Sequence, residues 1–470
     1  MYWKDDFYNM RGDLTRGKIF SALLRLAIPL AGGSVMQMAY NLLDMFWLGR
    51  VSGEAVAATG AAGLFIWLSV GLMTIGNVGA EVGVSQARGR GDFADAYRFS
   101  RASLYISAAL GLIYGAFLFL FRAPLVGFFR FQELQVAADA SAYTGIIAFG
   151  IPAMFISSTI GSTFVASGNS RTPFIINSIG LILNMILTPV MILPLGFGLG
   201  VFGAAVSSGI SKYFVLILSL IAVKHSKNRP FDEYRFRAKI RIPAIVQDLR
   251  TGTANKIFRL TIPVCLENTL WPLLTLVTTR IEVSFGAFAL TISRVGVQVE
   301  SLIWLVGGGF GGALTSFVGQ NFGAGKSERI SRGVKYTAYS MIAWAGLVMI
   351  FMWFAGGFVF RIFLPEYVGN TEMRSLFITH MRILAAFAIP FSLHIVAGGA
   401  FQGEGKTIPP SVTSIASNLI RVPLAFFLSR TSLGVLGVWF AISFTAGLRG
   451  LSVFIWYLWD RRKSNAGRLR

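Results

Sequence analysis

One carboxylate interrupts an apolar stretch near the start of the chain. The stretch MAYNLLDMFWLG covers residues 38–49 and holds Asp44 among apolar and small polar residues. A carboxylate in hydrocarbon is costly unless it faces a cavity or binds a proton. Asn41 and Gln37 lie three and seven residues earlier, so the three side chains share one helix face. We expect this polar face to bind a coupling ion, because a change of charge there can bias the protein between two states.

Two further carboxylates lie deep in apolar stretches of the second half. Glu267 follows Pro263 by one helical turn, and Glu300 lies well inside its own apolar run, so both reach the middle of a bilayer. Two interpretations stay open. Glu267 and Glu300 form a cation-binding wall of a substrate cavity that also includes Arg294, or they form ion pairs with Arg294 and Arg280.

Other reactive residue types give no catalytic or metal-binding pattern. The single cysteine, Cys265, and the three histidines have no metal-ligand spacing, and we expect His394 to be a hydrogen-bonding core residue. The glycine run GGGFGG at 307–312 lacks the strand and the lysine of a phosphate-binding loop, so we expect close helix packing there. The sequence therefore predicts no enzyme, no cofactor and no certain metal site. An intramembrane enzyme remains the alternative from another class.

Composition places these residues in a membrane. Hydrophobic residues make up 54% of the 470 residues and charged residues only 13%. Apolar runs of about 20 residues, long enough to cross a bilayer as helices, recur along the chain. The sequence predicts an all-α polytopic membrane protein with twelve spans, at 19–48, 56–84, 99–121, 140–166, 173–195, 200–223, 257–283, 288–317, 334–360, 376–401, 408–430 and 434–459.

The charges predict the orientation of these spans. The formal net charge is +21, and the basic residues gather in alternate loops and in the C-terminal tail. Because positive residues near span ends stay on the cytoplasmic side, we expect both termini and the basic linker 224–256 to be cytoplasmic. Topology and contact with anionic lipid headgroups explain this charge, so we expect no nucleic-acid partner. The basic clusters are Arg88, Arg90 and Arg98; residues 224–259; Lys326, Arg329, Arg332 and Lys335; and Arg461, Arg462, Lys463, Arg468 and Arg470.

The chain repeats itself at a constant offset of 234 residues. RLAIP at 25–29 returns as RLTIP at 259–263, VSQARGRG at 84–91 as VGQNFGAG at 318–325, and GVFGA at 200–204 as GVLGV at 434–438. This repeat predicts two pseudo-symmetric six-helix bundles. They are an N-lobe at 1–223 and a C-lobe at 257–470, joined by the linker 224–256. Because each half has an even number of spans, the two repeats are parallel and a substrate would lie between them.

Several longer motifs resemble those of one transporter family. The stretches IPLAGGSVMQMAYNLLDMFWLG, GNSRTPFIINSIGLILNMILTP, FVGQNFGAGKSERI and RVPLAFFL with LGVLGVWFAI are similar to the multidrug and toxic compound extrusion (MATE) transporters. The resemblance covers roughly residues 19–459. It implies a V-shaped pair of bundles that alternates between inward- and outward-open states and exports organic compounds in exchange for H⁺ or Na⁺.

The resemblance also implies a second part of the ion site, and here the chain departs from the family. Asn184 matches the family pattern, but Thr188 stands before Pro189 where an aspartate is expected. Tyr143 matches another polar position, whereas Gly161 replaces a family asparagine. Na⁺ binding near Asp44 and Asn184 needs several oxygen ligands, and a threonine supplies only a neutral hydroxyl. We therefore favour H⁺ over Na⁺ as the coupling ion.

Together, these features predict a secondary active exporter of small organic cations. We expect it to work by antiport and alternating access, as a multi-pass monomer in the inner membrane. The alternative is a lipid-linked glycan flippase of the same superfamily, whose cavity would carry Arg or Lys to match a pyrophosphate. Phe and Met are plentiful, with 41 and 14 residues, but they do not select one substrate.

Overall fold

The computed structural model describes residues 12–131, 133–194, 196–226 and 252–468. Its regular structure there is entirely helical, and twelve helices are long and apolar enough to cross a membrane, which confirms the predicted class. The first half supplies α2 (Ile19–Val51), α3 (Gly53–Gly89), α4 (Phe93–Gly127), α5 (Leu134–Ala166), α6 (Arg171–Ile192) and α7 (Gly200–His225). The second half supplies α9 (Thr253–Val283), α10 (Ala287–Gly323), α11 (Ser327–Phe354), α13 (Thr371–Gly403), α14 (Ile408–Ser429) and α15 (Val435–Arg468). A short helix α12 (Gly356–Phe363) and the 3-10 helix η1 (Pro365–Tyr367) join α11 to α13.

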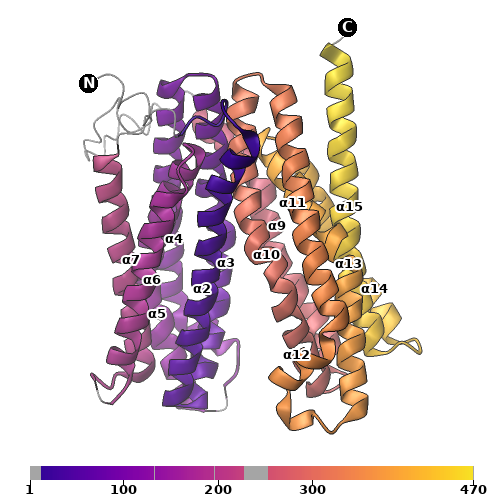
Figure 1. Ribbon diagram of the computed structural model, residues 1–470. Helices are drawn as coiled ribbons and strands as arrows, with labels where there is room; N and C mark the ends of the chain where they lie inside the picture. Colours follow the sequence, from indigo (N-terminus) through magenta and orange to yellow (C-terminus); the bar gives the residue numbers. More distant parts are fainter. Residues whose placement is uncertain (1–11, 132, 195, 227–251, 469–470) are drawn as a thin grey trace.

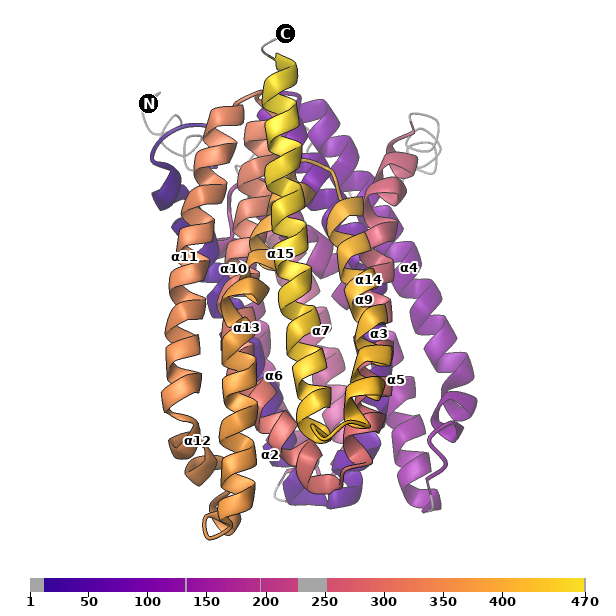
Figure 2. The ribbon, with the colours of Figure 1, turned by 90° about the vertical axis from the view of Figure 1, so that its right-hand side faces the viewer.

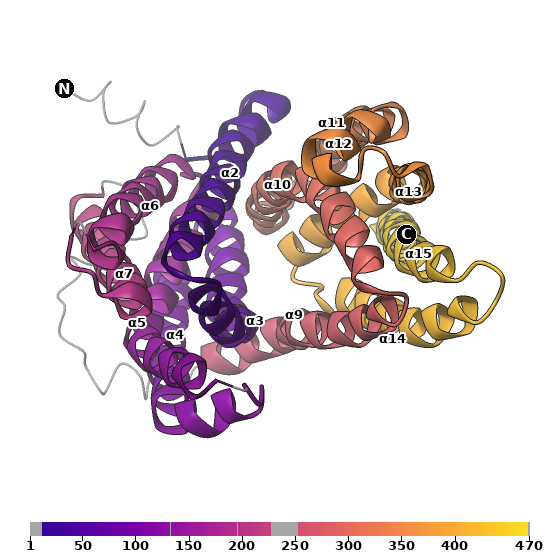
Figure 3. The same cartoon turned by 90° about the horizontal axis from the view of Figure 1, so that it is seen from below.

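The helices form two bundles that lie side by side. Figure 1 shows α2 to α7 on the left and α9 to α15 on the right. Seen from below, α2 and α3 of the first bundle face α9 and α10 of the second (Figure 3). We call these bundles the N-lobe and the C-lobe.

The two lobes use the same packing scheme, which confirms their pseudo-symmetry. In the N-lobe, α2 packs on α6 and reaches across to α10; in the C-lobe, α9 packs on α14 and reaches across to α3. Likewise, α5 is central to the first bundle and contacts α3, α4 and α7, as α13 is central to the second and contacts α10, α11 and α15. Each half thus lends its first helix to the interface with the other.

Both lobes enter from the same end of the molecule. Figures 1 and 2 show that α2 begins, and α15 ends, at the end where α7 stops and α9 starts. We call this the terminus end, and the opposite one the far end. The parallel arrangement agrees with an even number of spans per half. Most of the predicted linker lies outside the described residues, and its cytoplasmic location stays a prediction.

The repeated glycine motifs mark a reciprocal contact between the lobes. A Cβ atom on Gly89 of α3 would collide with the carbonyl oxygen of Gln320, and one on Gly323 of α10 with that of Gln86. The glutamine side chains then bond across the interface. Gln86 Nε2 donates to Gly403 O at 2.9 Å, and Gln320 Nε2 donates to Ala166 O at 2.8 Å. The motif therefore repeats because both helices need a small residue at their crossing.

The GGGFGG run serves the same purpose, as predicted. A side chain on Gly309 of α10 would meet the backbone of Ala27 and Ala31 on α2, so the glycine lets the two helices approach closely. Apolar residues just before α2 and in its first turns are also shared between the lobes. Leu14 and Leu23 are buried in the core of the C-lobe together with residues of α10 and α13.

Candidate functional site

Asp44 lies in the far half of α2, inside the N-lobe. Its side chain is half-buried, and its Oδ1 atom is buried with no hydrogen-bond partner among the described residues. Two phenols are its electrostatic neighbours: Tyr40, one turn earlier on α2, and Tyr143 on α5. The structure therefore brings the predicted Tyr143 to Asp44 and adds Tyr40, which the sequence analysis did not select.

The other two residues of the predicted polar face do not bond to this carboxylate. Gln37 Nε2 donates to Asn41 Oδ1 at 3.0 Å, and both side chains are exposed. They share a helix stripe with Asp44, as their spacing predicts. They satisfy each other, however, and leave Asp44 as the one charged group on that stripe.

Asn184 and Thr188 form a separate buried group on α6. Thr188 Oγ1 donates to Asn184 Oδ1 at 2.9 Å and lies 3.0 Å from Ser207 Oγ on α7. Asn184 is only 3% exposed and Thr188 only 1%. These oxygens are used in helix packing, and no hydrogen bond joins them to Asp44 in the described part of the chain. There, too, no three His, Cys, Asp or Glu side chains are grouped to hold a metal ion.

A lysine completes the polar interior of the N-lobe. Tyr40 Oη lies 3.4 Å from Ser208 Oγ on α7, and Lys212 follows Ser208 by one turn of the same helix. A row of polar groups thus runs from Asp44 through Tyr40 and Ser208 to Lys212. The signal for Lys212 was present in the sequence, since a lysine in the middle of an apolar span indicates function.

The C-lobe gathers its charges into one cluster. Glu267 of α9 lies with its Oε1 atom 3.8 Å from His394 Nε2 on α13, and Arg449 of α15 is its cationic neighbour. Glu300 of α10 has two electrostatic partners, Arg421 of α14 and the same Arg449. Two carboxylates therefore face two guanidinium groups, and the formal charges of the cluster balance.

Threonine and serine side chains hold the two arginines in place. Arg421 Nε donates to Thr445 Oγ1 at 3.1 Å, and Arg449 Nη1 donates to Ser414 Oγ at 3.2 Å. Arg421 is 6% exposed and Arg449 only 3%. Such burial without the two glutamates would be strongly unfavourable. Arg421 and Arg449 are therefore neighbours of the glutamates that spacing along one helix could not reveal. Both interpretations of Glu267 and Glu300 stay open.

Arg294 was expected in the substrate cavity beside Glu300, and the structure places it elsewhere. Its side chain is exposed, and its acidic neighbour is Glu282 at the end of α9 rather than Glu300. Six residues on a helix correspond to a turn of about 240°, so Arg294 and Glu300 point in different directions from α10. Ser293 Oγ also donates to Glu282 Oε1 at 3.1 Å, which fixes that carboxylate away from the cluster.

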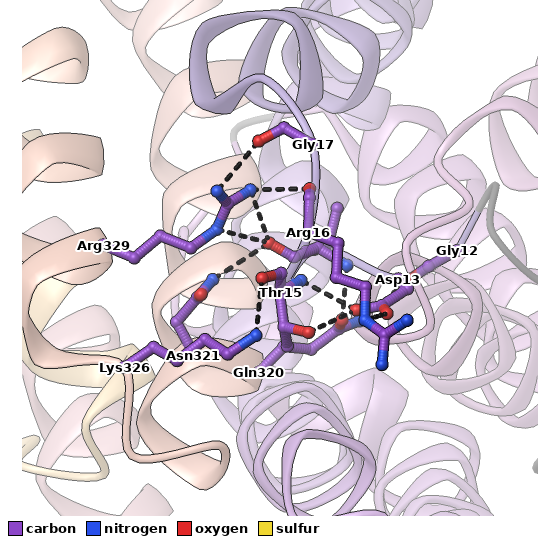
Figure 4. A network of polar contacts seen from close by, with 10 residues as sticks. Gly12, Asp13, Thr15, Arg16, Gly17, Gln320, Asn321, Lys326 and Arg329 are labelled. Carbon is purple, nitrogen blue, oxygen red and sulfur yellow. Dashed lines mark hydrogen bonds and ion pairs between the residues drawn. The ribbon is translucent and has the colours of Figure 1, made fainter.

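At the terminus end, the residues before α2 tie the lobes together. We call residues 12–17 the strap. Figure 4 shows side chains of α10, of α11 and of Lys326 between them reaching its backbone. The bonds run from Leu14 N to Gln320 Oε1 (2.9 Å), Asn321 Nδ2 to Leu14 O (3.1 Å), Lys326 Nζ to Thr15 O (2.9 Å), Arg329 Nη2 to Arg16 O (2.7 Å) and Arg329 Nη1 to Gly17 O (2.8 Å).

Deeper between the lobes, Ser316 Oγ of α10 donates to Glu81 Oε1 of α3 at 3.2 Å.

Known proteins match the chain over almost its whole length. The MatE family model matches residues 29–190 and 263–427. A probable multidrug resistance protein NorM of Thermotoga maritima is 25% identical and aligns over 95% of this chain and 94% of its own. A FAD transporter of Shewanella oneidensis is 24% identical, with 94% of this chain and 95% of its own aligned.

Solved structures show the same fold. A MATE transporter in the bent conformation superimposes with a TM-score of 0.85, at 21% identity, over 98% of this chain and 99% of its own. A MOP superfamily transporter from Pyrococcus furiosus, for which a reversed polarity of the binding pocket suggests a different function, gives 0.83 at 21% identity over 96% and 98%.

Proposed function

Since this chain belongs to the MatE family of multidrug efflux transporters, we propose that it exports small organic cations by exchanging them for H⁺. Membership makes it a multi-pass membrane transporter. The coupling ion, the antiport cycle and the charge of the substrate are our proposals. So are its location in the inner membrane with cytoplasmic termini and its action as a monomer.

The unpartnered carboxylate of Asp44 carries the proposal. A group that gains or loses a proton in a low-dielectric interior changes the energy of the state around it. When Asp44 is charged, it attracts a cationic substrate; when it binds a proton, that attraction is lost and the substrate leaves. Tyr40 and Tyr143 are electrostatic neighbours of the carboxylate but do not hydrogen-bond to its Oδ1 atom.

The neighbouring polar group favours H⁺ over Na⁺. A Na⁺ site would need several free oxygen ligands around Asp44. Asn184 and Thr188, the residues that the family resemblance implies, are buried and bonded to each other, and Thr188 is also bonded to Ser207. A proton needs only the carboxylate itself.

The strap supports an alternating-access cycle. In this structure the lobes are joined at the terminus end by the strap and by the reciprocal Gln86 and Gln320 bonds. If that end is cytoplasmic, as the positive charges predict, this conformation closes the inner side. Opening it requires the C-lobe to release the strap.

A lipid-linked glycan flippase is the second candidate. The buried guanidinium groups of Arg421 and Arg449 favour it, because a pyrophosphate would need cations. Glu267 and Glu300 weaken that candidate, since they already balance both arginines.

Transport in proteoliposomes tests these proposals. Purified protein is given an H⁺ gradient or a Na⁺ gradient separately, and uptake of a fluorescent organic cation is followed. We expect uptake with the H⁺ gradient and none in Asp44→Asn, while Asp139→Asn at the start of α5 is the matched control. Uptake that follows Na⁺ and ignores pH would refute the ion assignment. Normal H⁺-driven uptake by Asp44→Asn would refute the coupling role.

A further inference from the structure

Lys212 lies about midway along α7, and its side chain points into the N-lobe. One stripe of the helix carries Ser208, Lys212 and Ser219. Both serines are buried, and Lys212 is partly buried. The opposite stripe carries the exposed Ile210 and Ile217, which suit lipid. Lys212 is therefore an intramembrane cation on the protein side of its helix.

The contacts of Lys212 hold its ammonium group against α5. A Cβ atom added to Gly150 would lie 3.0 Å from Lys212 Cδ and 3.8 Å from Nζ, so the missing side chain of Gly150 makes room for the lysine. The side chain is enclosed by protein yet keeps some accessible surface.

No described residue neutralises this charge. Among the ion pairs and hydrogen bonds of the described residues none involves Lys212 Nζ, and Asp44 is not an electrostatic neighbour of Lys212. Intramembrane lysines otherwise pair with a carboxylate or a backbone carbonyl. The buried arginines of the C-lobe have glutamates as electrostatic neighbours, and Lys212 has no acidic neighbour among the described residues.

We propose that Lys212 binds the acid group of an organic monoanion, a carboxylate or a sulfonate, in the N-lobe. One ammonium group balances one negative charge, whereas a doubly charged phosphate would need a second cation. Ser208 lies one turn before Lys212 on α7, and its hydroxyl is 3.4 Å from that of Tyr40, so polar groups flank the lysine on the protein side of the helix. The substrates would then include solutes with an acid group, which goes beyond the export of cations.

Binding to the purified full-length protein tests this site without any gradient. The protein is placed in nanodiscs of zwitterionic phosphatidylcholine, so no anionic lipid competes. Three probes of nearly equal shape are titrated by fluorescence: naphthoate, naphthalenesulfonate and the neutral naphthamide. We expect wild-type protein to bind both acids about tenfold more tightly than the amide, the ratio typical of a hydrogen bond to a charged group.

Substitutions then assign that preference to one residue. Lys212→Met should bind all three probes equally, and Lys212→Arg should keep the preference for the acids. Lys224→Met is the matched control on the same helix, because Lys224 is exposed in the last turn of α7. Equal binding of acid and amide by the wild type would overturn the proposal, even if Lys212→Met failed to fold. So would an undiminished preference in Lys212→Met.

Discussion

The two lobes pack their helices alike but arrange their charges differently. In the N-lobe, Asp44 and Lys212 are separate groups without a counter-charge. In the C-lobe, Glu267 and Glu300 share Arg449, and Arg421 completes a balanced cluster. The repeat has therefore kept the packing of the two halves and not their chemistry. Unpaired charges are suited to exchange ligands, and paired charges to hold helices in register.

The alignment of the repeats shows which positions differ between the two lobes. At the offset of 234 residues, Asp44 corresponds to Thr278 and Glu267 corresponds to Gly33. The glycines and glutamines at the helix crossing, by contrast, correspond one to one. Residues that let two helices approach are kept in both halves, while residues that face the interior are free to differ.

The largest effect that the comparison predicts lies in the paired lobe. Replacing Arg449 by Met would leave Glu267 without its cationic neighbour and Glu300 with only one. We expect the free energy of unfolding to fall by about 3 kcal/mol, measured by denaturant titration in detergent. Adding Glu300→Gln should recover part of the loss, because one of the uncompensated charges is gone. If Arg449→Met is no less stable than Arg361→Met, an exposed arginine of α12, the cluster is not balanced as described.

Removing a charge from the N-lobe should change the free energy of unfolding in the opposite direction. Asp44→Asn removes a charge that has no partner, so we expect the free energy of unfolding to rise by about 1 to 2 kcal/mol. A fall in stability would show that Asp44 has a stabilising partner. Asp139→Asn again serves as the control.

Replacing a carboxylate of the C-lobe should reduce transport less than Asp44→Asn does. Glu267→Gln nearly keeps the side-chain shape and leaves Glu300 beside Arg449, so the protein should fold normally. We expect export of cationic dyes to weaken by about fivefold, within the usual range of coupling between sites. Equal export by Glu267→Gln and by Glu372→Gln, an exposed control at the start of α13, would return Glu267 to a purely structural role.

The smallest effect belongs to an ion pair at the terminus end. Lys406 Nζ lies 2.5 Å from Asp460 Oδ2 and 3.2 Å from Glu404 Oε2. Burial lowers the pKa of Lys406, but the hydrogen bonds and charges of Asp460 and Glu404 outweigh it, so its pKa is raised. Since the folded pKa is the higher one, this contribution is present at neutral pH and is lost as pH rises through the folded pKa.

We therefore expect Lys406→Met to cost about 0.5 kcal/mol at neutral pH, because the lysine is 40% exposed and solvent screens the pair. The difference between Lys406→Met and wild type should shrink in strongly alkaline solution. A difference that grows with pH would contradict the assigned sign.

The fold could be predicted from the sequence to a large extent, because the length of an apolar run determines whether a helix crosses a bilayer. The helix ends could not. We expected spans to end at 84 and 317, but α3 continues to Gly89 and α10 to Gly323. Polar residues end the apolar run without ending the helix, because the hydrogen bonds of a helix are made by the backbone and do not need apolar side chains. Helix α12 was likewise absorbed into a longer predicted span.

The site was less predictable, because sequence spacing relates residues on one helix and not between helices. Asp44 was identified from its own surroundings. The partners of Glu300 come from α14 and α15, more than 100 residues away, and spacing on α10 wrongly suggested Arg294 instead. Which faces of two helices meet depends on packing across the bundle. Residue spacing along one helix does not reveal that packing.

The strap also has a consequence for biosynthesis. Leu14 and the side chain of Gln320 that it bonds are 306 residues apart in the chain. While the first lobe enters the membrane, the backbone groups of the strap have no partners, and Leu14 has no core to enter. Both are satisfied only once the ribosome has made α10 and the start of α11. The strap therefore stays accessible to chaperones and proteases until most of the polypeptide has been inserted, so that a chain truncated before α10 is open to degradation at residues 12–17.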